Sequence, residues 1–182
     1  NDNNVFAQVN TCFIDVRFAS VSWGDYDNDG YIDALINGLA AGGSNGQVVT
    51  RVYRNQRNGT FTDINSGIQG VKEGSNSWVD YDNDGDLDVF LLGNSSASGT
   101  YPATRLYRND GNGYFSSVTT SIPNIYSGSA AWGDYDNDGE KDVLIGGSNG
   151  TSYETKLFRN NGFGSFTEVN TLFHAGNGAK VG

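Results

Sequence analysis

Apolar residues along this chain gather in short, continuous runs that are separated by polar, glycine-rich stretches. The three clearest runs are Ala34-Leu35-Ile36, Val89-Phe90-Leu91-Leu92 and Val143-Leu144-Ile145. Runs of this length are typical of strands that are buried on both faces. A block with alternating polarity follows each run and predicts a half-exposed strand, and no stretch has a convincing helical period. The pattern therefore predicts an all-β chain.

The same elements recur three times in one order. A Trp-x-Asp-Tyr-Asp-Asn-Asp-Gly block occupies residues 23–30, 78–85 and 132–139. An Arg/Lys-x-Tyr/Phe-Arg-Asn block follows at 51–55, 105–109 and 156–160, and a Gly-x-Phe block at 59–61, 113–115 and 164–166. Each repeat of about 54 residues contains four predicted strands. Such units predict the blades of a β-propeller, with a stacked β-solenoid, whose coils are usually shorter, as the alternative.

The spacing of aromatic residues predicts where the blades begin and end. Phe61 and Phe115 each precede a tryptophan by 17 residues, and Phe6 stands at the same distance from Trp23. We therefore expect residues 1–17 to form the outer strand of a preceding or neighbouring blade. Residues 18–70, 71–124 and 125–175 are predicted as blades 1, 2 and 3, and residues 176–182 as the lead-in to a further blade.

Three blades are too few to close a ring, because propellers typically have four to eight. The interpretation that we favour is a segment of a longer propeller protein. The alternative is a chain that closes by self-association through its open blade faces.

Each repeat contains an acidic nonapeptide with aspartate at positions 1, 3, 5 and 9 and glycine at position 6. Alternate carboxylates on a tight turn converge on one point, and glycine permits the sharp turn. Hard oxygen ligands in this number suit Ca²⁺ better than Mg²⁺, and a solvated acidic turn is the metal-free alternative. The sequence predicts about three Ca²⁺ ions, one per blade. The predicted carboxylate ligands are Asp25, Asp27, Asp29 and Asp33; Asp80, Asp82, Asp84 and Asp88; and Asp134, Asp136, Asp138 and Asp142.

Position 7 of each nonapeptide is predicted to add a backbone carbonyl, from Tyr31, Asp86 or Glu140. Two other calcium loops with the same start do not fit. An EF-hand needs glutamate at position 12, where this chain has Ile36, Leu91 or Ile145. RTX-type repeats recur every nine residues rather than once per blade.

These loops, together with the Arg-Asn and Gly-x-Phe blocks, resemble the FG-GAP/VCBS repeats of integrin α-chain-like propellers. The resemblance covers about residues 5–175. It implies a propeller with Ca²⁺ in the loop that joins the first two strands of each blade, and every aspartate named above matches a ligand position of the family. Members of the family adhere to proteins, bind sugars or accompany enzymes, so the resemblance leaves the partner open.

Composition excludes several functions. The net charge of −10 argues against nucleic acid and anionic membrane surfaces as partners, and no apolar run is long enough for membrane insertion. The chain has one histidine, His174, and no recognisable catalytic set, so we do not expect an enzyme. Asn58, Asn94 and Asn149 lie in glycosylation sequons in predicted loops.

The repeated side chains outside the acidic loops have structural interpretations. Trp23, Trp78 and Trp132 are expected to pack blade on blade, with sugar-stacking platforms as the alternative. The arginines at 54, 108 and 159 are expected to make turn and cross-strand bonds, with ligand contacts as the alternative.

The sequence as a whole predicts a calcium-stabilised, extracellular β-propeller module, secreted or at the cell surface. We expect it to act in protein binding, adhesion or self-assembly, with a protein partner or a second copy at the open blade faces. A lectin-like, carbohydrate-binding module is the alternative.

Overall fold

A computed structural model of the chain describes residues 12–41 and 46–169. These residues form twelve strands in three four-stranded antiparallel sheets, each arranged like a propeller blade. Blade 1 contains β1 (Val16–Gly24), β2 (Asp33–Ala40), β3 (Gln47–Asn55) and β4 (Phe61–Asp63), hydrogen-bonded in that order. The predicted all-β fold with four strands per repeat is confirmed.

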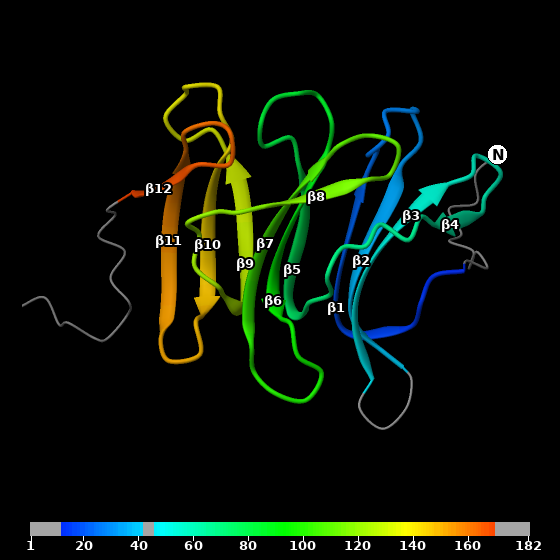
Figure 1. Ribbon diagram of the computed structural model, residues 1–182, viewed down its shortest axis with the longest axis horizontal. Helices are drawn as coiled ribbons and strands as arrows, with labels where there is room; N and C mark the ends of the chain where they lie inside the picture. The colour runs from blue at the N-terminus through cyan, green and yellow to red at the C-terminus, as the bar shows by residue number, and fades with distance from the viewer. Residues whose placement is uncertain (1–11, 42–45, 170–182) are drawn as a thin grey trace, which may run out of the picture.

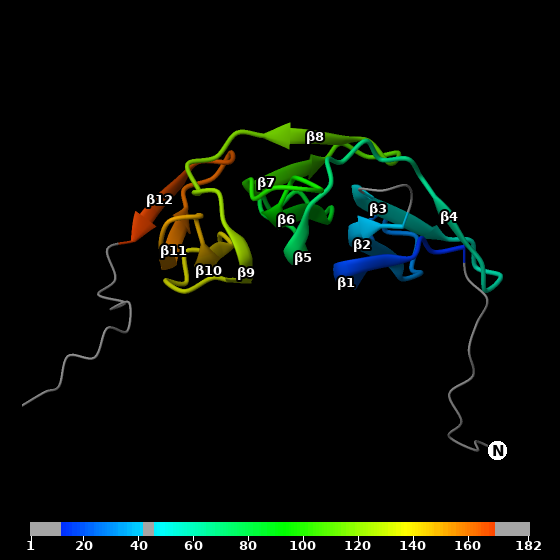
Figure 2. The same ribbon diagram turned by 90° about the horizontal axis from the view of Figure 1, so that it is seen from below.

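Blades 2 and 3 repeat this arrangement. Blade 2 contains β5 (Lys72–Val79), β6 (Asp88–Asn94), β7 (Pro102–Asn109) and β8 (Phe115–Val118). Blade 3 contains β9 (Tyr126–Gly133), β10 (Asp142–Ser148), β11 (Tyr153–Asn160) and β12 (Phe166–Val169). The three blades stand side by side in an arc, with β1, β5 and β9 on its inner side and β4, β8 and β12 on its outer side (Figure 2). No helix among the described residues could cross a membrane.

The core lies between neighbouring blades because each sheet has an apolar side chain on both faces. Leu35 and Val52 of blade 1 pack with Val89 and Leu91 of blade 2. Blades 2 and 3 share a second cluster of the same kind, to which Phe90 contributes. The continuous apolar runs are therefore buried on both faces in β2 and β6, as predicted.

Two of the three repeated tryptophans pack between blades. Trp78 stacks on Tyr26 of blade 1, with ring centroids 6.0 Å apart. Trp132 packs edge-on against Phe90 of blade 2 at 5.1 Å. Among the described residues no blade packs on Trp23, which is 60% exposed, so the expectation of a core role is wrong for this tryptophan.

The segment that enters blade 1 is held like the segment that enters blade 3. The Cys12 thiol and the Ser121 hydroxyl donate to the carbonyl oxygens of Phe61 and Phe166, both at 2.6 Å. β1 begins at Val16, and the rest of the outer strand predicted at 1–17 falls mainly on residues outside the described part. The lead-in predicted at 176–182, and His174, also lie outside the described residues.

One sequon does not lie in a loop. Asn94 is the last residue of β6, and its side chain is buried. Its Nδ2 donates to Glu73 Oε2 at 3.1 Å and to the Gly99 carbonyl at 2.8 Å. Because this amide is engaged on both sides, Asn94 is not accessible for glycosylation in the folded chain.

Candidate metal centres

The three acidic loops join the first strand of each blade to the second. They lie at residues 25–32, 80–87 and 134–141, and all three are at the same end of the blades, at the top of Figure 1. The antiparallel pairing of β1 with β2, and of its counterparts, fixes both ends of each loop. The repeat therefore places three equivalent sites along one edge of the arc.

Each loop brings three aspartates together. In each triad, one carboxylate oxygen per residue lies within 4.8 Å of the others, a spacing that could hold a metal ion. The triads are Asp25, Asp27 and Asp29 in blade 1; Asp80, Asp82 and Asp88 in blade 2; and Asp134, Asp136 and Asp142 in blade 3. Nine of the twelve predicted carboxylate ligands are therefore gathered, and Asp33, Asp84 and Asp138 stand outside these triads.

Tight backbone turns close the loops. Gly30, Gly85 and Gly139 have φ angles of 85°, 95° and 96°, where a side chain is strained. The first aspartate holds the turn from within, because Asp25 accepts the amides of Asp29 at 3.0 Å and Gly30 at 2.8 Å. Glycine at position 6 thus has the conformational role that the sequence predicts.

The aspartate at position 9 ties the loop to the third strand of its blade. Asp88 is fully buried, and its two oxygens accept the amides of Tyr81 at 3.1 Å and Asn109 at 2.8 Å. Asp33 and Asp142 make the corresponding pairs of bonds. Position 9 therefore couples the geometry of the acidic loop to the sheet itself.

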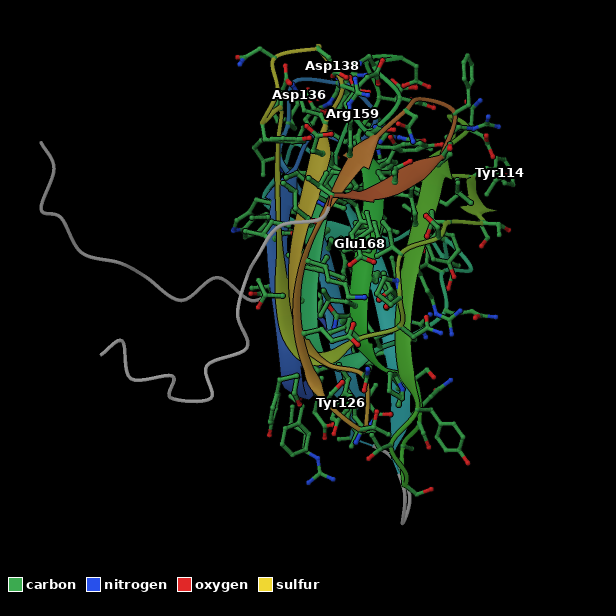
Figure 3. All side chains as sticks on the ribbon, turned by 90° about the vertical axis from the view of Figure 1, so that its left-hand side faces the viewer. Tyr114, Tyr126, Asp136, Asp138, Arg159 and Glu168 are labelled. Atoms are coloured by element: carbon green, nitrogen blue, oxygen red, sulfur yellow. The ribbon has the colours of Figure 1, made fainter. Side chains whose placement is uncertain are left out.

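Sequence reasoning missed the arginines at the end of the third strands. Arg54 Nε lies 2.7 Å from Asp27 Oδ2, and its Nη2 lies 3.1 Å from Asp29 Oδ2. Arg159 makes the same two bonds in blade 3, to Asp136 and Asp138 (Figure 3). Their recurrence in every repeat was the available signal. The expectation of turn bonds is met, because both arginines bond to aspartates of the acidic turns, but these partners were not named from the sequence.

Blade 2 differs because its arginine is held elsewhere. Both Nε and Nη2 of Arg108 bond to Asp110 Oδ1, at 2.8 and 2.5 Å. Position 110 is aspartate only in this blade; the corresponding residues are Gln56 and Asn161. Asp86 in blade 2 and Glu140 in blade 3 each add a fifth carboxylate to their loops. Because an arginine pairs with the loop in blade 3 but not in blade 2, blade 2 has the largest uncompensated negative charge of the three.

Several carboxylate oxygens in the loops lack any hydrogen-bond partner among the described residues although they are buried. These are Asp27 Oδ1, Asp80 Oδ1 and Asp82 Oδ1. A buried carboxylate oxygen without a donor is costly, and a bound cation removes that cost. The donor sets, which contain only oxygen, therefore fit a hard divalent cation such as Ca²⁺.

The pKa values of the loop carboxylates reflect burial and mutual repulsion. Burial raises the pKa of Asp88 to about 7 and that of Asp33 to about 6, although backbone amides oppose the change. Burial also raises the pKa of Asp82, and the neighbouring Asp84 adds to the increase. The bond from Arg57 instead lowers the pKa of Asp29. Without a cation, Asp33 and Asp88 are therefore harder to ionise than ordinary carboxyl groups.

Comparison with known families agrees with this geometry. Residues 80–145 match the family model of the FG-GAP-like repeat. The match starts at the first aspartate of the blade 2 loop and ends within β10, so it includes two of the three acidic loops. The chain therefore contains an FG-GAP-like repeat, as the sequence resemblance implied. No curated protein matches the chain.

Proposed function

We propose that the chain is a calcium-stabilised β-propeller module that acts through protein contacts outside the cell. The observation that carries the proposal is the gathering of three aspartates in every acidic loop, with ligand atoms within 4.8 Å of one another. Calcium would supply positive charge at each cluster and hold the first two strands of each blade together. The FG-GAP-like repeat supports a binding module rather than a catalyst, because such repeats are typically non-catalytic.

The ligand chemistry favours calcium over magnesium. Each loop offers four or more carboxylates and a position 7 carbonyl from Tyr31, Asp86 or Glu140, which together approach the six to eight oxygens that Ca²⁺ takes. Magnesium keeps several waters and usually uses one or two carboxylates. An extracellular location suits sites of this kind, because extracellular calcium modules work at affinities of about 10⁻⁴ to 10⁻³ M.

Thermal denaturation with and without a chelator tests the structural role of the metal. Because the ions bind the folded loops and the unfolded chain offers no such clusters, binding energy adds to folding stability. We expect EDTA to lower the melting temperature and added CaCl₂ to restore it. A melting curve that is the same under both conditions would contradict the proposal.

A carbohydrate-binding function is the second candidate, and one pocket supports it. This pocket lies between blades 1 and 2 beside the acidic loop, and its lining includes Asp27, Arg54, Asp86, Asn109 and Asn112. Carboxylate, amide and guanidinium groups of this kind can bond to sugar hydroxyls. A glycan array that uses the calcium-loaded chain tests this candidate, with binding that disappears in Asn112→Ala as the supporting result.

A further inference from the structure

The two ends of the arc expose complementary halves of the same junction. Neighbouring blades meet twice within the chain, once between blades 1 and 2 and once between blades 2 and 3. Among the described residues, no further blade lies on the outward face of blade 1 or on the outward face of blade 3 (Figure 2). The contacts of the two internal junctions show what each outward face lacks.

A loop-to-loop hydrogen bond occurs at both internal junctions. Asn28 Nδ2 of blade 1 donates to the Gly85 carbonyl and to Asp86 Oδ1 of blade 2, at 3.3 and 2.7 Å. Asn83 of blade 2 donates in the same way to Gly139 and Glu140 of blade 3, both at 3.2 Å. The corresponding donor in blade 3 is Asn137, which is exposed. The corresponding acceptor in blade 1 is the Gly30 carbonyl, whereas Tyr31, at the position of Asp86 and Glu140, has no carboxylate.

A second hydrogen bond crosses each junction in the opposite direction. Asn109 Nδ2 donates to the Tyr26 carbonyl at 2.8 Å, and Asn160 Nδ2 to the Tyr81 carbonyl at 2.7 Å. The corresponding donor in blade 1 is Asn55, whose Nδ2 reaches only Ile32 of its own blade among the described residues. The corresponding acceptor is the carbonyl of Tyr135 on the outward face of blade 3.

Several apolar side chains that are packed at the internal junctions are exposed at the same repeat positions on the two outward faces. Tyr26 and Tyr81 are 4% and 3% exposed within the junctions, whereas Tyr135 is 47% exposed. Leu144 is 39% exposed, although the same repeat position is buried as Leu35 in blade 1 and Phe90 in blade 2. Blade 3 thus exposes the side chains that face a following blade, and blade 1 exposes Trp23, which faces a preceding one.

Each outward face has open space beside a glycine, and the other outward face presents a side chain at the repeat position that fills this space at the internal junctions. A Cβ added at Gly24 would lie 2.6 Å from the Trp78 ring, whereas one at Gly133 of blade 3 meets nothing within 4 Å. A Cβ at Gly113 would lie 3.3 Å from Ile64 and one at Gly164 would lie 2.5 Å from Val118, whereas one at Gly59 of blade 1 meets nothing. Trp23 and Val169 are the residues whose repeat positions would fill the spaces at Gly133 and Gly59.

The segment that enters blade 1 covers part of its outward face, where Ala34, Ile36 and Tyr53 are buried. Phe13 packs on Tyr53 and Phe61, at ring-centroid distances of 5.0 and 4.9 Å. Ile68 and Ile122 are the corresponding residues at the internal junctions, where they belong to the shared cores. Because both junctions form with that residue in place, Phe13 belongs to the docking surface.

We propose that the outward face of blade 3 in one copy of this chain docks on the outward face of blade 1 in a second copy. Each copy offers both faces, so two copies make two such junctions and a ring of six blades, within the range known for propellers. This inference deepens the proposed function by naming a second copy as the partner. The inference rests on the proposed function, because both depend on the blade arrangement and on the acidic loops.

Sedimentation equilibrium of the calcium-loaded chain over a concentration series tests the pairing. We expect a species of twice the 19.5 kDa chain mass. Trp23→Lys and Leu144→Lys should each weaken association by at least about tenfold, because each places a charge at the centre of one docking face. Both residues are exposed in the single chain, so the calcium-dependent melting of the monomer should change little.

Tyr114→Lys is the matched control. Tyr114 is exposed, lies on the hairpin between β7 and β8, and projects from the outer edge of the blades (Figure 3). It lies on neither outward face, so this variant should associate like the unaltered chain. Equal weakening by Tyr114→Lys would show a nonspecific effect of charge and would overturn the pairing.

Mixing the two disruptive variants separates this head-to-tail contact from a symmetric one. The Trp23→Lys chain keeps an intact blade 3 face, and the Leu144→Lys chain keeps an intact blade 1 face. An equimolar mixture should therefore form a mixed dimer through one unaltered junction, more tightly than either variant alone. No gain on mixing would overturn the proposal.

A chain that is monomeric at every concentration would also overturn the proposal. That result is expected if blades of another protein, and not a second copy of this chain, cover the two outward faces. The chelator experiment distinguishes this failure from failure of the calcium function, because a monomer whose melting responds to EDTA keeps the metal role.

Discussion

Arg159 Nε lies 2.8 Å from Asp136 Oδ2 at the edge of the blade 3 aspartate triad. The guanidinium is half-exposed, and it also bonds to Asp138 through Nη2. A cation bound among these aspartates would share their negative charge with the arginine. Arg54 stands in the same relation to Asp27 in blade 1, whereas Arg108 in blade 2 is paired with Asp110. We therefore expect the arginine to lower the calcium affinity of the sites in blades 1 and 3 but not that of the site in blade 2.

Replacing Arg159 with glutamine should raise the calcium affinity of the blade 3 site. The guanidinium competes with the ion for the same carboxylates, and exposed ion pairs are worth up to about 1 kcal/mol, so the gain should be at most about fivefold. Isothermal titration calorimetry of the variant measures it. Arg108→Gln is the control, since that guanidinium bonds to Asp110 outside the acidic loop. Equal gains in both variants would refute the competition.

Asp82→Asn should remove calcium binding from blade 2 alone. Asp82 belongs to the blade 2 triad, and its Oδ1 is buried with no partner among the described residues. At calcium levels about 100 times the dissociation constant, loss of one ion should lower the melting temperature by roughly 5–10 °C. In EDTA the variant should melt no lower than the unaltered chain.

Asp110→Asn serves as the comparison for this experiment because it removes a carboxylate from the same blade but not from its loop. A drop of equal size in the two variants, or an Asp82→Asn drop that persists in EDTA, would show that the aspartate acts without metal.

The metal-free chain should become less stable as the pH rises from about 5 to about 8. The folded-state pKa values of Asp33 and Asp88, about 6 and about 7, exceed the unfolded value of about 3.9. A raised folded pKa gives stability that is complete below the unfolded pKa and lost as the pH rises through the folded one. Asp29 and Asp138 have lowered pKa values, so they change the stability of the fold only at pH values below this range.

Calcium should reverse this trend, because it binds the ionised carboxylates. Denaturant titrations in EDTA and in CaCl₂ at both pH values check the two signs, and calcium affinity should fall as the pH drops below about 7. A metal-free chain that gains stability toward pH 8 would contradict the assignment to Asp33 and Asp88.

Leu35→Ala should destabilise the chain by about 2–5 kcal/mol, because Leu35 is fully buried between blades 1 and 2. Leu144→Ala at the same repeat position should cost less than about 1.5 kcal/mol at concentrations where the chain is monomeric, because that side chain is partly exposed. Urea unfolding of both variants measures the difference. Similar losses would mean that the outward face of blade 3 is covered within the single chain.

Much of the fold follows from the repeat. The apolar runs predict the second strands, the Gly-x-Phe blocks predict the outer strands, and the nonapeptide spacing predicts the acidic loops between the first two strands. These features are local in sequence, and the structure has them in all three blades. The resemblance to FG-GAP repeats extends the same inference to the metal and is matched over residues 80–145.

What the repeat could not predict depends on neighbours in space. Trp23, Trp78 and Trp132 share one repeat position, but within the described part of the chain only Trp78 and Trp132 have a preceding blade to pack against. Arg54 and Arg159 reach the acidic loops because the third strand ends beside them, and a single aspartate at 110 redirects Arg108. The sequence identifies the sequon at Asn94, but it does not show that the Asn94 side chain is hydrogen-bonded to Glu73 and to the Gly99 carbonyl.

Calcium stoichiometry tests the central claim most directly. Three acidic loops of one design should bind three Ca²⁺ ions per chain, which isothermal titration calorimetry of the chelator-treated, dialysed chain can count. The account predicts three ions, and two in Asp82→Asn. Binding of no calcium, or an unchanged count in that variant, would contradict it.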